Sequence, residues 1–388
     1  MKKIPYATQW IDNDDIAAVV KTLRSAFLTQ GPLVAGFEKA VADYCGAKYA
    51  VAVSNGTAAL HLACLAADLK PGDEVITSPI TFVASANAAL YVGAKPVFAD
   101  IDSGTALIDP AEVKKKITRK TRAIIPVDFA GHPADLKAIK ELAAKHKLMV
   151  IEDAAHSLGA DYRSKKVGAC QYADMTVLSF HPVKLITSGE GGMVLTNSRK
   201  LYNKLVLLRT HGITRDADSL KENHGPWYYE MQTLGFNYRI TDFQCALGIS
   251  QLKKLPDFVK RRRIIVAAYN KAFSRQDGIT ALENKDQAAS AHHLYILRFA
   301  QDRFSASRRQ IFEAYRRAGI MVNVHYIPVY WQPYYQALGY KKGLCPRAEK
   351  FYEEAITLPL YPRMTGSDVN KVIRATKAII SKTIRKNS

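Results

Sequence analysis

The feature that most limits the fold of this sequence is the alternation of short apolar segments with helical ones. Segments rich in β-branched residues occupy 48–54, 74–80, 95–101, 123–129, 148–154 and 175–181, and helical patterns occupy 83–92 and 134–146. Strands that alternate with helices of this length indicate βαβ units and a mostly parallel sheet with helices on both faces. The sequence therefore predicts an α/β fold whose ligands bind at the carboxyl ends of the strands.

The last third of the chain has a different pattern. A long helical stretch covers 241–273, and we expect it to break near Pro256 because proline lacks the amide N–H. Segments 293–299 and 321–327 read as strands around a helix at 307–318, and two helical segments follow. The pattern predicts a large domain over residues 1–250 and a smaller α/β domain over residues 251–388.

Length and composition are those of an ordinary globular protein. The chain has 388 residues, 48% of them hydrophobic, which is enough for more than one core. Its five cysteines are odd in number and form no C-x-x-C, so we expect neither disulfides nor a metal site. The N-terminus lacks the apolar region of a signal peptide, and the longest apolar run, 58–69, is short of a membrane span. We therefore expect a soluble, cytoplasmic protein without a membrane partner.

The net charge of +20 allows two interpretations. A basic surface can bind nucleic acid, or it can attract small anionic ligands. The densest basic clusters, 260–263 and 371–388, lie on helical patterns and contain no recognition motif. A solvated basic surface without nucleic-acid binding is the expected outcome.

Polar and aromatic residues follow three of the predicted strands. Gly56 and Thr57 open a helix, so they form either an anion site or an ordinary helix cap. Phe82 could stack on a flat ring or pack in the core. Asp153 ends an apolar segment, where a carboxylate must be paired or hydrogen-bonded. A protonated pyridine nitrogen would satisfy Asp153, and so would the N-terminus of the next helix.

The stretch SFHPVK adds an amine to this edge of the sheet. Lys184 follows a strand end and lies 31 residues beyond Asp153, and Ser179 offers a hydroxyl to the same anion site. A lone loop lysine is usually solvated, but a desolvated one has a lowered pKa and can act as nucleophile and base. Phosphate cradle, ring partner, carboxylate and amine together are what pyridoxal 5′-phosphate requires. GEGG at 189–192 precedes a strand, so it is not a dinucleotide-binding loop.

Longer motifs identify a family. They are LTQGP (28–32), SNGTAAL (54–60), IEDAAHSLGA (151–160), SFHPVK (179–184), GEGG (189–192), GFNYRITDFQCALG (235–248) and HYIPVY (325–330). With these motifs nearly the whole chain resembles the DegT/StrS-type sugar-nucleotide aminotransferases. The resemblance implies a pyridoxal-phosphate enzyme with the aspartate-aminotransferase fold (fold type I), a large sheet domain and a smaller C-terminal domain.

The resemblance also implies roles for the strand-end residues. Lys184 would form the Schiff base with the cofactor and move protons, and Asp153 would pair with the pyridine nitrogen. His156 would lie beside the ring and its hydroxyl, and Phe82 would stack on the ring. Some relatives carry histidine at the lysine position and perform dehydration, so Lys184 favours transamination.

The phosphate site and the assembly follow from the same motifs. Gly56, Thr57 and Ser179 would hold the phosphate. Asn237 would complete that site from the neighbouring subunit, which implies a homodimer with shared active sites.

Two segments, 226–244 and 324–335, resemble the branch of the family that acts in pseudaminic acid synthesis. This implies transfer of an amino group from L-glutamate to C4 of UDP-2-acetamido-2,6-dideoxy-β-L-arabino-hex-4-ulose. The product would be UDP-4-amino-4,6-dideoxy-N-acetyl-β-L-altrosamine. The residues that would contact the nucleotide-sugar are Tyr6, Ala26, Phe27, Leu28, Thr29, Gly56, Ser179, Asn237, His325, Tyr326, Ile327 and Pro328.

Two alternatives remain at this level. The first is transamination of another keto-hexose linked to GDP, dTDP or UDP. The second, from a different class, is a non-catalytic basic regulator that binds nucleic acid and keeps the aminotransferase fold.

Overall fold

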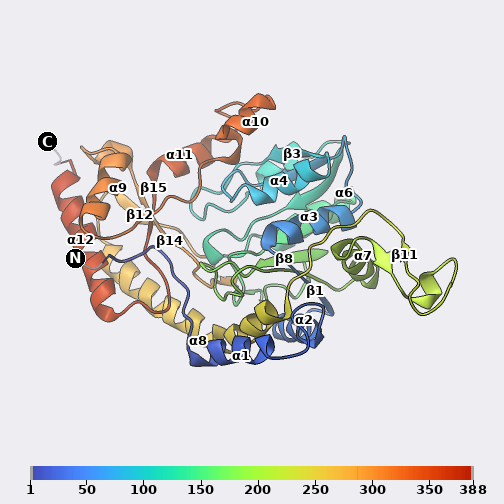
Figure 1. Cartoon of the computed structure of the whole chain (residues 1–388). Helices are drawn as coiled ribbons and strands as arrows, with labels where there is room; N and C mark the ends of the chain where they lie inside the picture. The colour runs from blue at the N-terminus through green and yellow to red at the C-terminus, as the bar shows by residue number, and fades with distance from the viewer. Residues whose placement is uncertain (1–2, 286, 386–388) are drawn as a thin grey trace.

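A large mixed sheet forms the centre of the protein, with a smaller sheet to one side (Figure 1). The computed structural model describes residues 3–285 and 287–385. Within those residues the large sheet has seven strands, in the order β1 (Tyr49–Val53), β9 (Gly192–Thr196), β8 (Met175–Ser179), β5 (Met149–Asp153), β4 (Thr121–Ile125), β2 (Glu74–Thr77) and β3 (Lys95–Phe98).

The strand directions bring the functional segments to one edge of this sheet. β8, β5, β4, β2 and β3 pair in parallel, whereas β9 lies antiparallel between β1 and β8. β1 therefore runs in the same direction as β8, and every strand of this sheet except β9 ends at the same edge. The predicted α/β fold with a mostly parallel sheet is confirmed.

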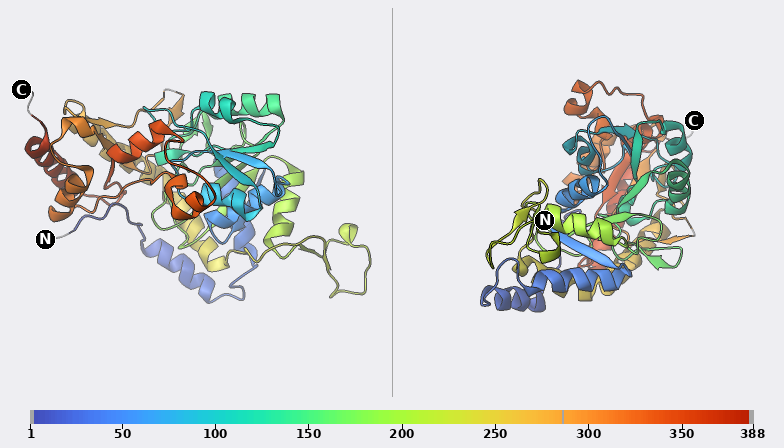
Figure 2. Two further views of the ribbon diagram at one scale, coloured as in Figure 1. Left: turned by 90° about the horizontal axis from the view of Figure 1, so that it is seen from above. Right: turned by 90° about the vertical axis from the view of Figure 1, so that its right-hand side faces the viewer.

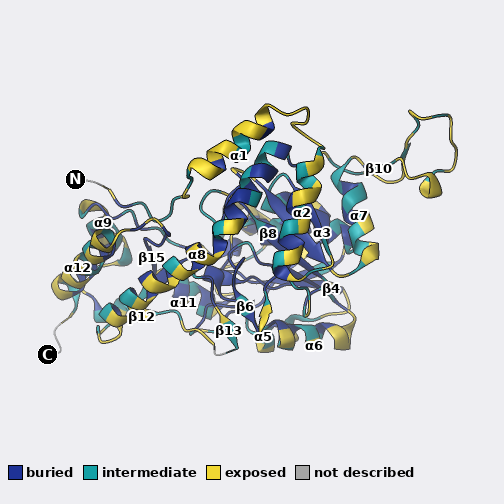
Figure 3. Cartoon of the chain, turned by 90° about the horizontal axis from the view of Figure 1, so that it is seen from below, coloured by how far each residue is buried: buried dark blue, intermediate teal, exposed yellow. Residues whose placement is uncertain are grey.

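Alternate side chains of each strand enter different cores. Val51 and Val53 of β1 pack on one face of the sheet, and Ala50 and Ala52 pack on the other. Both faces are covered by helices, so the strands are mostly apolar and most of their residues are buried (Figure 3). The helices whose side chains join the first face are α3 (Gly56–Ala66), α4 (Ala84–Tyr91) and α7 (Arg199–Arg209). The helices that serve the opposite face are α2 (Pro32–Cys45), α6 (Leu136–His146) and α8 (Asp242–Phe273), with α5 (Pro110–Lys116) beside α6.

The C-terminal part has its own sheet and core. Its sheet has the order β12 (Ile279–Ala281), β14 (Tyr295–Phe299) and β15 (Ala355–Leu358), and every pairing is antiparallel. Two helices, α9 (Arg308–Arg317) and α12 (Gly366–Thr383), share the apolar core of this sheet. A further small sheet contains β13 (Ala288–Ala289), β6 (Asp161–Tyr162) and β7 (Lys165–Lys166).

The long helix α8 does not break at Pro256, so that expectation is wrong. α8 runs from Asp242 to Phe273 with Pro256 inside it. Proline leaves the carbonyl four residues earlier without its helical donor, but the Pro256 ring itself lies on the exposed side of the helix. Leu255 and Phe258 on either side are buried, and their packing holds the helix in one piece.

α8 also spans the expected domain boundary after residue 250. Its first half packs in the core behind the large sheet, and Ile265 and Tyr269 pack in the C-terminal core. Ile4, near the start of the chain, packs in that C-terminal core as well and bridges to Ile320. The division into 1–250 and 251–388 stays a prediction.

The predicted strand at 321–327 is also wrong. This segment is extended, but its ladder contact is a single bridge between Asn323 and Thr357 of β15. The apolar residues of the segment serve other packing, because Val322 enters the C-terminal core and Tyr326 packs beside Phe129. The segment lies at the edge of the large sheet where the parallel strands end, and it is not itself a strand.

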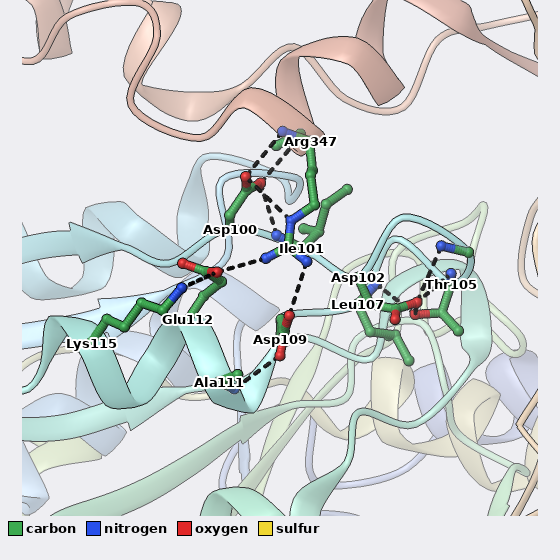
Figure 4. Close-up of polar contacts among 12 residues, drawn as sticks. Asp100, Ile101, Asp102, Thr105, Leu107, Asp109, Ala111, Glu112, Lys115 and Arg347 are labelled. Atoms are coloured by element: carbon green, nitrogen blue, oxygen red, sulfur yellow. Dashed lines mark hydrogen bonds and ion pairs between the residues drawn. The ribbon is translucent and has the colours of Figure 1, made fainter.

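An interlocked set of polar contacts fastens the segment around Arg347 to the large sheet (Figure 4). Asp100, just beyond β3, accepts hydrogen bonds from the backbone N–H groups of Arg347 and Ala348 at 3.0 and 2.9 Å. These donors lie at the start of α11 (Pro346–Glu354), so a residue from a distant part of the chain caps this helix. The Arg347 guanidinium contacts Asp109 at 3.0 Å and Glu112 at 2.9 Å. The segment between 328 and 345, which includes α10 (Pro333–Ala337), is thereby held against α4 and β3.

Two further segments carry exposed apolar side chains. A long arm carries the short strands β10 (Ile213–Thr214) and β11 (Glu230–Met231) and projects away from the sheet (Figures 1 and 2). Trp227 on this arm is 72% exposed. Helix α1 (Asn13–Leu23) lies along α8 and presents Ile16 and Leu23 to solvent. The single chain leaves these apolar side chains uncovered.

Between residues 3 and 385, 286 aside, no helix is both long and apolar enough to cross a membrane. The cytoplasmic location stays a prediction. Four of the five cysteines, Cys45, Cys64, Cys245 and Cys345, are buried and unpaired, as expected for small apolar side chains.

Candidate active site

A cavity of about 1120 Å³ opens where the strands of the large sheet end. Its walls come from the segments after β1, β2, β5 and β8 and from the extended segment 323–327. The fold thus brings together most of the residues that the motifs singled out. The predicted site residues that line this cavity are Tyr6, Gly56, Thr57, Phe82, Asp153, His156, Ser179, Lys184, His325, Tyr326 and Ile327.

Six predicted residues do not line the cavity of the single chain. Ala26, Phe27, Leu28 and Thr29 form an exposed turn between α1 and α2. Asn237 is also exposed, although both of its neighbours in sequence line the cavity. Pro328 is buried just beyond the cavity wall. Any contact of these residues with substrate or cofactor stays a prediction.

Lys184 lies in the tight turn after β8. Its backbone N–H donates to the carbonyl of His181 at 2.9 Å, which returns the side chain toward the sheet edge. The side chain is half-buried in the cavity wall. Desolvation lowers the pKa of Lys184 to about 8, and the nearby charge of Asp153 opposes that shift. A substantial share of the amine is therefore neutral near physiological pH, as a nucleophile or general base requires.

Asp153 closes β5 and is buried at the floor of the cavity. Its carboxylate accepts a hydrogen bond of 2.6 Å from the Ser85 hydroxyl and one of 3.2 Å from the backbone N–H of Ala155. No basic side chain within residues 3–385, 286 aside, forms an ion pair with it. Burial raises the pKa of Asp153, whereas the bond from Ser85 lowers it. A buried carboxylate in this state is stabilised by a cationic ligand group.

The start of α3 forms a cradle for an anion. Asn55 caps the helix by accepting from the backbone N–H of Ala58 at 2.8 Å. In the described part of the chain, the backbone N–H groups of Gly56 and Thr57 have no hydrogen-bond acceptor. A side chain at Gly56 would meet the Cβ of Ser179 at 3.0 Å, so glycine lets the helix end approach β8 closely. Free N–H groups, the helix dipole and two hydroxyls converge there.

Aromatic rings border the space between Asp153 and Lys184. Phe82 is 57% exposed although it lines the cavity, so its ring face is available to a ligand. Its ring centroid lies 6.3 Å from that of Tyr326. His156 is buried, and its Nε2 lies 3.4 Å from the hydroxyl of Tyr326. Burial, the charge of Lys184 and that of His325 hold the pKa of His156 well below its usual value.

Sequence reasoning missed several residues of this cavity. Ser85 is the most important of them, because it binds Asp153. Its hydroxyl also lies 2.7 Å from that of Thr81, which precedes α4, and no local sequence signal indicates this arrangement. An aromatic group of the cavity lining was missed as well. Its members are His61, Tyr91, Phe236 and Tyr238, and His61 lies four residues after Thr57.

The architecture around this cavity defines a class. Solved structures that superpose on the chain include pyridoxal-phosphate-dependent sugar aminotransferases of α/β fold. The profile of the DegT/DnrJ/EryC1/StrS aminotransferase family matches residues 9–377, and the chain belongs to this family. The predicted resemblance and the predicted enzyme class are confirmed.

Similar sequences span nearly the full chain. An uncharacterised protein of Methanocaldococcus jannaschii is 43% identical, and the match covers 96% of each chain. The spore coat polysaccharide biosynthesis protein SpsC of Bacillus subtilis is 41% identical over 97% of each chain. The UDP-4-amino-4,6-dideoxy-N-acetyl-β-L-altrosamine transaminase of Campylobacter jejuni is 39% identical over 98% of each chain.

Two solved structures illustrate the likeness of the fold. Helicobacter pylori PseC, an aminotransferase involved in the biosynthesis of pseudaminic acid, has a TM-score of 0.90 and 34% identity. That match covers 98% of this chain and 100% of PseC. The sugar aminotransferase Spr1654 of Streptococcus pneumoniae in its pyridoxal-phosphate form has a TM-score of 0.90 and 32% identity. That match covers 98% of this chain and 99% of Spr1654.

The cofactor of this family is pyridoxal phosphate, and the residues of this chain suit it. The cradle at Gly56 and Ser179 has free donors for a phosphate. Buried Asp153 has no cationic partner among the described residues, and a protonated ring nitrogen is such a partner. The desolvated amine of Lys184 lies in the same cavity. The donor set therefore fits the group that the family implies.

Proposed function

We propose that this enzyme transfers an amino group from L-glutamate to C4 of UDP-2-acetamido-2,6-dideoxy-β-L-arabino-hex-4-ulose. The product would be UDP-4-amino-4,6-dideoxy-N-acetyl-β-L-altrosamine. The observation that carries this substrate is the 39% identity, over 98% of both chains, with the Campylobacter jejuni transaminase of that name. The likeness to Helicobacter pylori PseC supports it from the structural side.

Lys184 is proposed to act as the acid and base of the reaction. Bound pyridoxal phosphate supplies an electron sink and carries the amino group between the two substrates. The neutral Nζ of Lys184 would take a proton from Cα of glutamate, and in its protonated form Nζ would deliver a proton to C4 of the sugar. Its lowered pKa supports this role, because the neutral and charged amines are both accessible near pH 8.

Asp153 is proposed to hold the ring nitrogen of the cofactor in its protonated state. The hydrogen bonds from Ser85 to Oδ2 and from Ala155 to Oδ1 give each carboxylate oxygen one donor and fix the orientation of the group. A charge-assisted bond to a ring nitrogen would be stronger than these neutral bonds. His156 is proposed to lie beside the ring and its hydroxyl, and Phe82 to stack on the ring face.

Gly56, Thr57 and Ser179 are proposed to hold the phosphate group. The free N–H groups at the start of α3 and the closeness of Gly56 to Ser179 support this role. The nucleotide-sugar is proposed to bind along Tyr6, His325, Tyr326 and Ile327 at the opposite wall of the cavity. That wall is aromatic, with ring centroids of Tyr6 and His325 5.6 Å apart.

The working unit is proposed to be a homodimer with shared sites. Exposed Asn237 would reach the phosphate site of the neighbouring subunit, and the turn 26–29 would contact its substrate. Pro328 would position the wall that precedes it. The exposed apolar residues of α1 and of the arm support an interface between chains, because large apolar side chains are rarely left in solvent together. They include Ile16, Leu23, Phe27, Trp227, Met231 and Leu234.

A second candidate is transamination of another nucleotide-linked keto-hexose. The observation that favours it is the 41% identity with SpsC, a protein of spore coat polysaccharide biosynthesis. The non-catalytic regulator is not retained, because the chain belongs to an aminotransferase family. The absence of nucleic-acid binding stays a prediction.

The deciding assay offers keto sugars linked to UDP, GDP and dTDP to the purified enzyme with L-glutamate. We expect turnover of the UDP-linked L-arabino 4-ketose and formation of 2-oxoglutarate, and NMR of the product fixes the position and configuration of the new amine. No turnover of that sugar, with turnover of another one, would replace the first candidate by the second.

A further inference from the structure

A second buried histidine lies directly behind His156. The ring centroids of His156 and His293 are 4.3 Å apart, with their planes inclined by 41°. His293 is 3% exposed and does not line the cavity. His156 does line it, and on another side its ring stacks against that of Tyr326. The imidazole of His156 is therefore held between the cavity and a second imidazole.

The backbone around His293 is fixed from two directions. The guanidinium of Arg262, buried in α8, donates to the carbonyls of His292 and His293 at 3.2 and 3.1 Å. Gly131 lies against the same segment, and a side chain there would meet the backbone nitrogen of His293 at 2.6 Å. Gly131 has a positive φ of 92°, so glycine permits both the turn and the close approach. This anchoring determines where the His293 ring lies.

Hydrogen bonds do not explain the pairing of the two rings. The Nδ1 atoms of both histidines are buried, and neither has a hydrogen-bond partner among the described residues. The acids of this region are engaged by hydroxyl groups instead: Asp153 by Ser85, Asp128 by Ser157 and Glu152 by Thr176. The two rings are therefore held together by their packing against each other and by the exclusion of water.

The titratable groups that act electrostatically on the pair are basic. Lys184, Arg262 and His325 all act on His293, and Lys184 and His325 act on His156. Together with burial they hold the pKa of both imidazoles well below the usual value, so both rings are neutral. A space behind His156 would admit water and relieve this desolvation.

We propose that His293 is a positioning residue that seals the back of His156 and fixes the orientation in which the His156 ring meets the cofactor. The role of His293 rests on the proposed contact between His156 and the cofactor ring. In this role His293 touches neither cofactor nor substrate, and it belongs to none of the sequence motifs that identify the family.

The test uses the cofactor-loaded enzyme and the absorbance of the bound cofactor as a function of pH. His293→Ala and the less disruptive His293→Val remove the ring, and His293→Phe keeps a ring of similar size. His156→Asn removes the group on which His293 acts. Absorbance reports the environment of the cofactor directly, so the readout does not depend on turnover.

We expect His293→Ala, His293→Val or both to add a step to the absorbance titration that is absent from the wild type. Its midpoint should lie displaced toward the ordinary histidine pKa of about 6.5, because water reaches His156. His293→Phe should keep the wild-type curve, and the double variant His156→Asn/His293→Val should lose the new step. Rescue by phenylalanine would show that ring packing, and not a nitrogen atom, is the active feature.

Two results would overturn the role of His293, and they differ in what else they affect. If His156→Asn changes the absorbance but neither small variant at 293 adds a step, His156 keeps its role and His293 only fills space. If His156→Asn leaves the absorbance unchanged, the proposed contact of His156 with the cofactor fails as well.

Discussion

The Ser85 hydroxyl donates a hydrogen bond of 2.6 Å to Asp153, and both side chains are buried. Ser85 belongs to the first turn of α4 and Asp153 to the end of β5, so two separate elements meet at this bond. The bond leaves the carboxylate in one orientation toward the cavity. Ser85 is thereby the residue on which the position of Asp153 depends.

Ser85→Ala is therefore expected to reduce turnover by about 10-fold. A hydrogen bond to a charged group contributes roughly 1.5–3 kcal/mol, and its loss leaves Asp153 less well oriented. Steady-state kinetics measures the effect, with Ser103→Ala, an exposed serine beyond β3, as the control. Equal turnover in the two variants would show that Ser85 does not orient Asp153.

Asp153→Asn is expected to retain the cofactor but to lose most turnover. The amide is similar in size to the carboxylate, so the buried site still packs, but it no longer stabilises a protonated ring nitrogen. Cofactor content by absorbance and turnover by product release separate the two effects. Unchanged turnover would remove Asp153 from its proposed role.

Lys184→Ala is expected to abolish turnover and covalent retention of the cofactor. The matched control is Lys165→Ala, an exposed lysine of β7 far from the cavity lining. Treatment with borohydride followed by mass spectrometry should find the cofactor fixed to the control chain and to the wild type. A cofactor fixed to the Lys184→Ala chain would place the reactive amine elsewhere.

The uptake of cofactor by the cofactor-free protein is expected to rise with pH through about 8. Lys184 is charged below its lowered pKa of about 8 and neutral above it, and the neutral amine is the nucleophile. Asp153 raises that pKa, so Asp153→Asn should move the midpoint to lower pH. Stopped-flow absorbance over a pH series measures both curves. A wild-type midpoint near 10.5, the ordinary value, would contradict the desolvation of Lys184.

The shared site predicts complementation between two inactive variants. In a mixed dimer, one subunit carries Lys184→Ala and the other carries Asn237→Ala. If Asn237 serves the neighbouring site, one site contains both substitutions and the other contains neither. Random pairing of equal amounts makes half of the dimers mixed, so about a quarter of wild-type activity should return. Activity that never exceeds that of the better variant alone would mean that Asn237 serves its own chain or none.

Much of this fold is readable from the sequence, because each buried strand is a short run of apolar residues followed by a helical pattern. The ends of β1, β5 and β8 therefore placed Gly56, Asp153 and Lys184 at one edge of the sheet. The errors have a common cause. Segment 321–327 has strand-like residues, and Pro256 is a helix breaker, but packing partners distant in sequence decide both.

The same limit applies to the site. The motifs led to Lys184 and Asp153 because a strand end is a local signal. His293 becomes visible only when its ring is seen 4.3 Å behind that of His156, 137 positions earlier in the chain. The turn 26–29 and Asn237 lie outside the cavity of a single chain, and a sequence does not say which subunit receives a side chain.

The continuous course of α8 constrains how ligands enter and leave. One uninterrupted helix of 32 residues contributes side chains to the cores on both sides of the cavity. Closing the C-terminal sheet onto the large one as a rigid body would require this helix to bend, which costs many packed contacts at once. Glutamate and the bulky nucleotide-sugar are therefore expected to enter and leave through a cavity opening whose width does not change. The side chains that line this opening would then discriminate between the two substrates, and no closing movement of the protein would be needed.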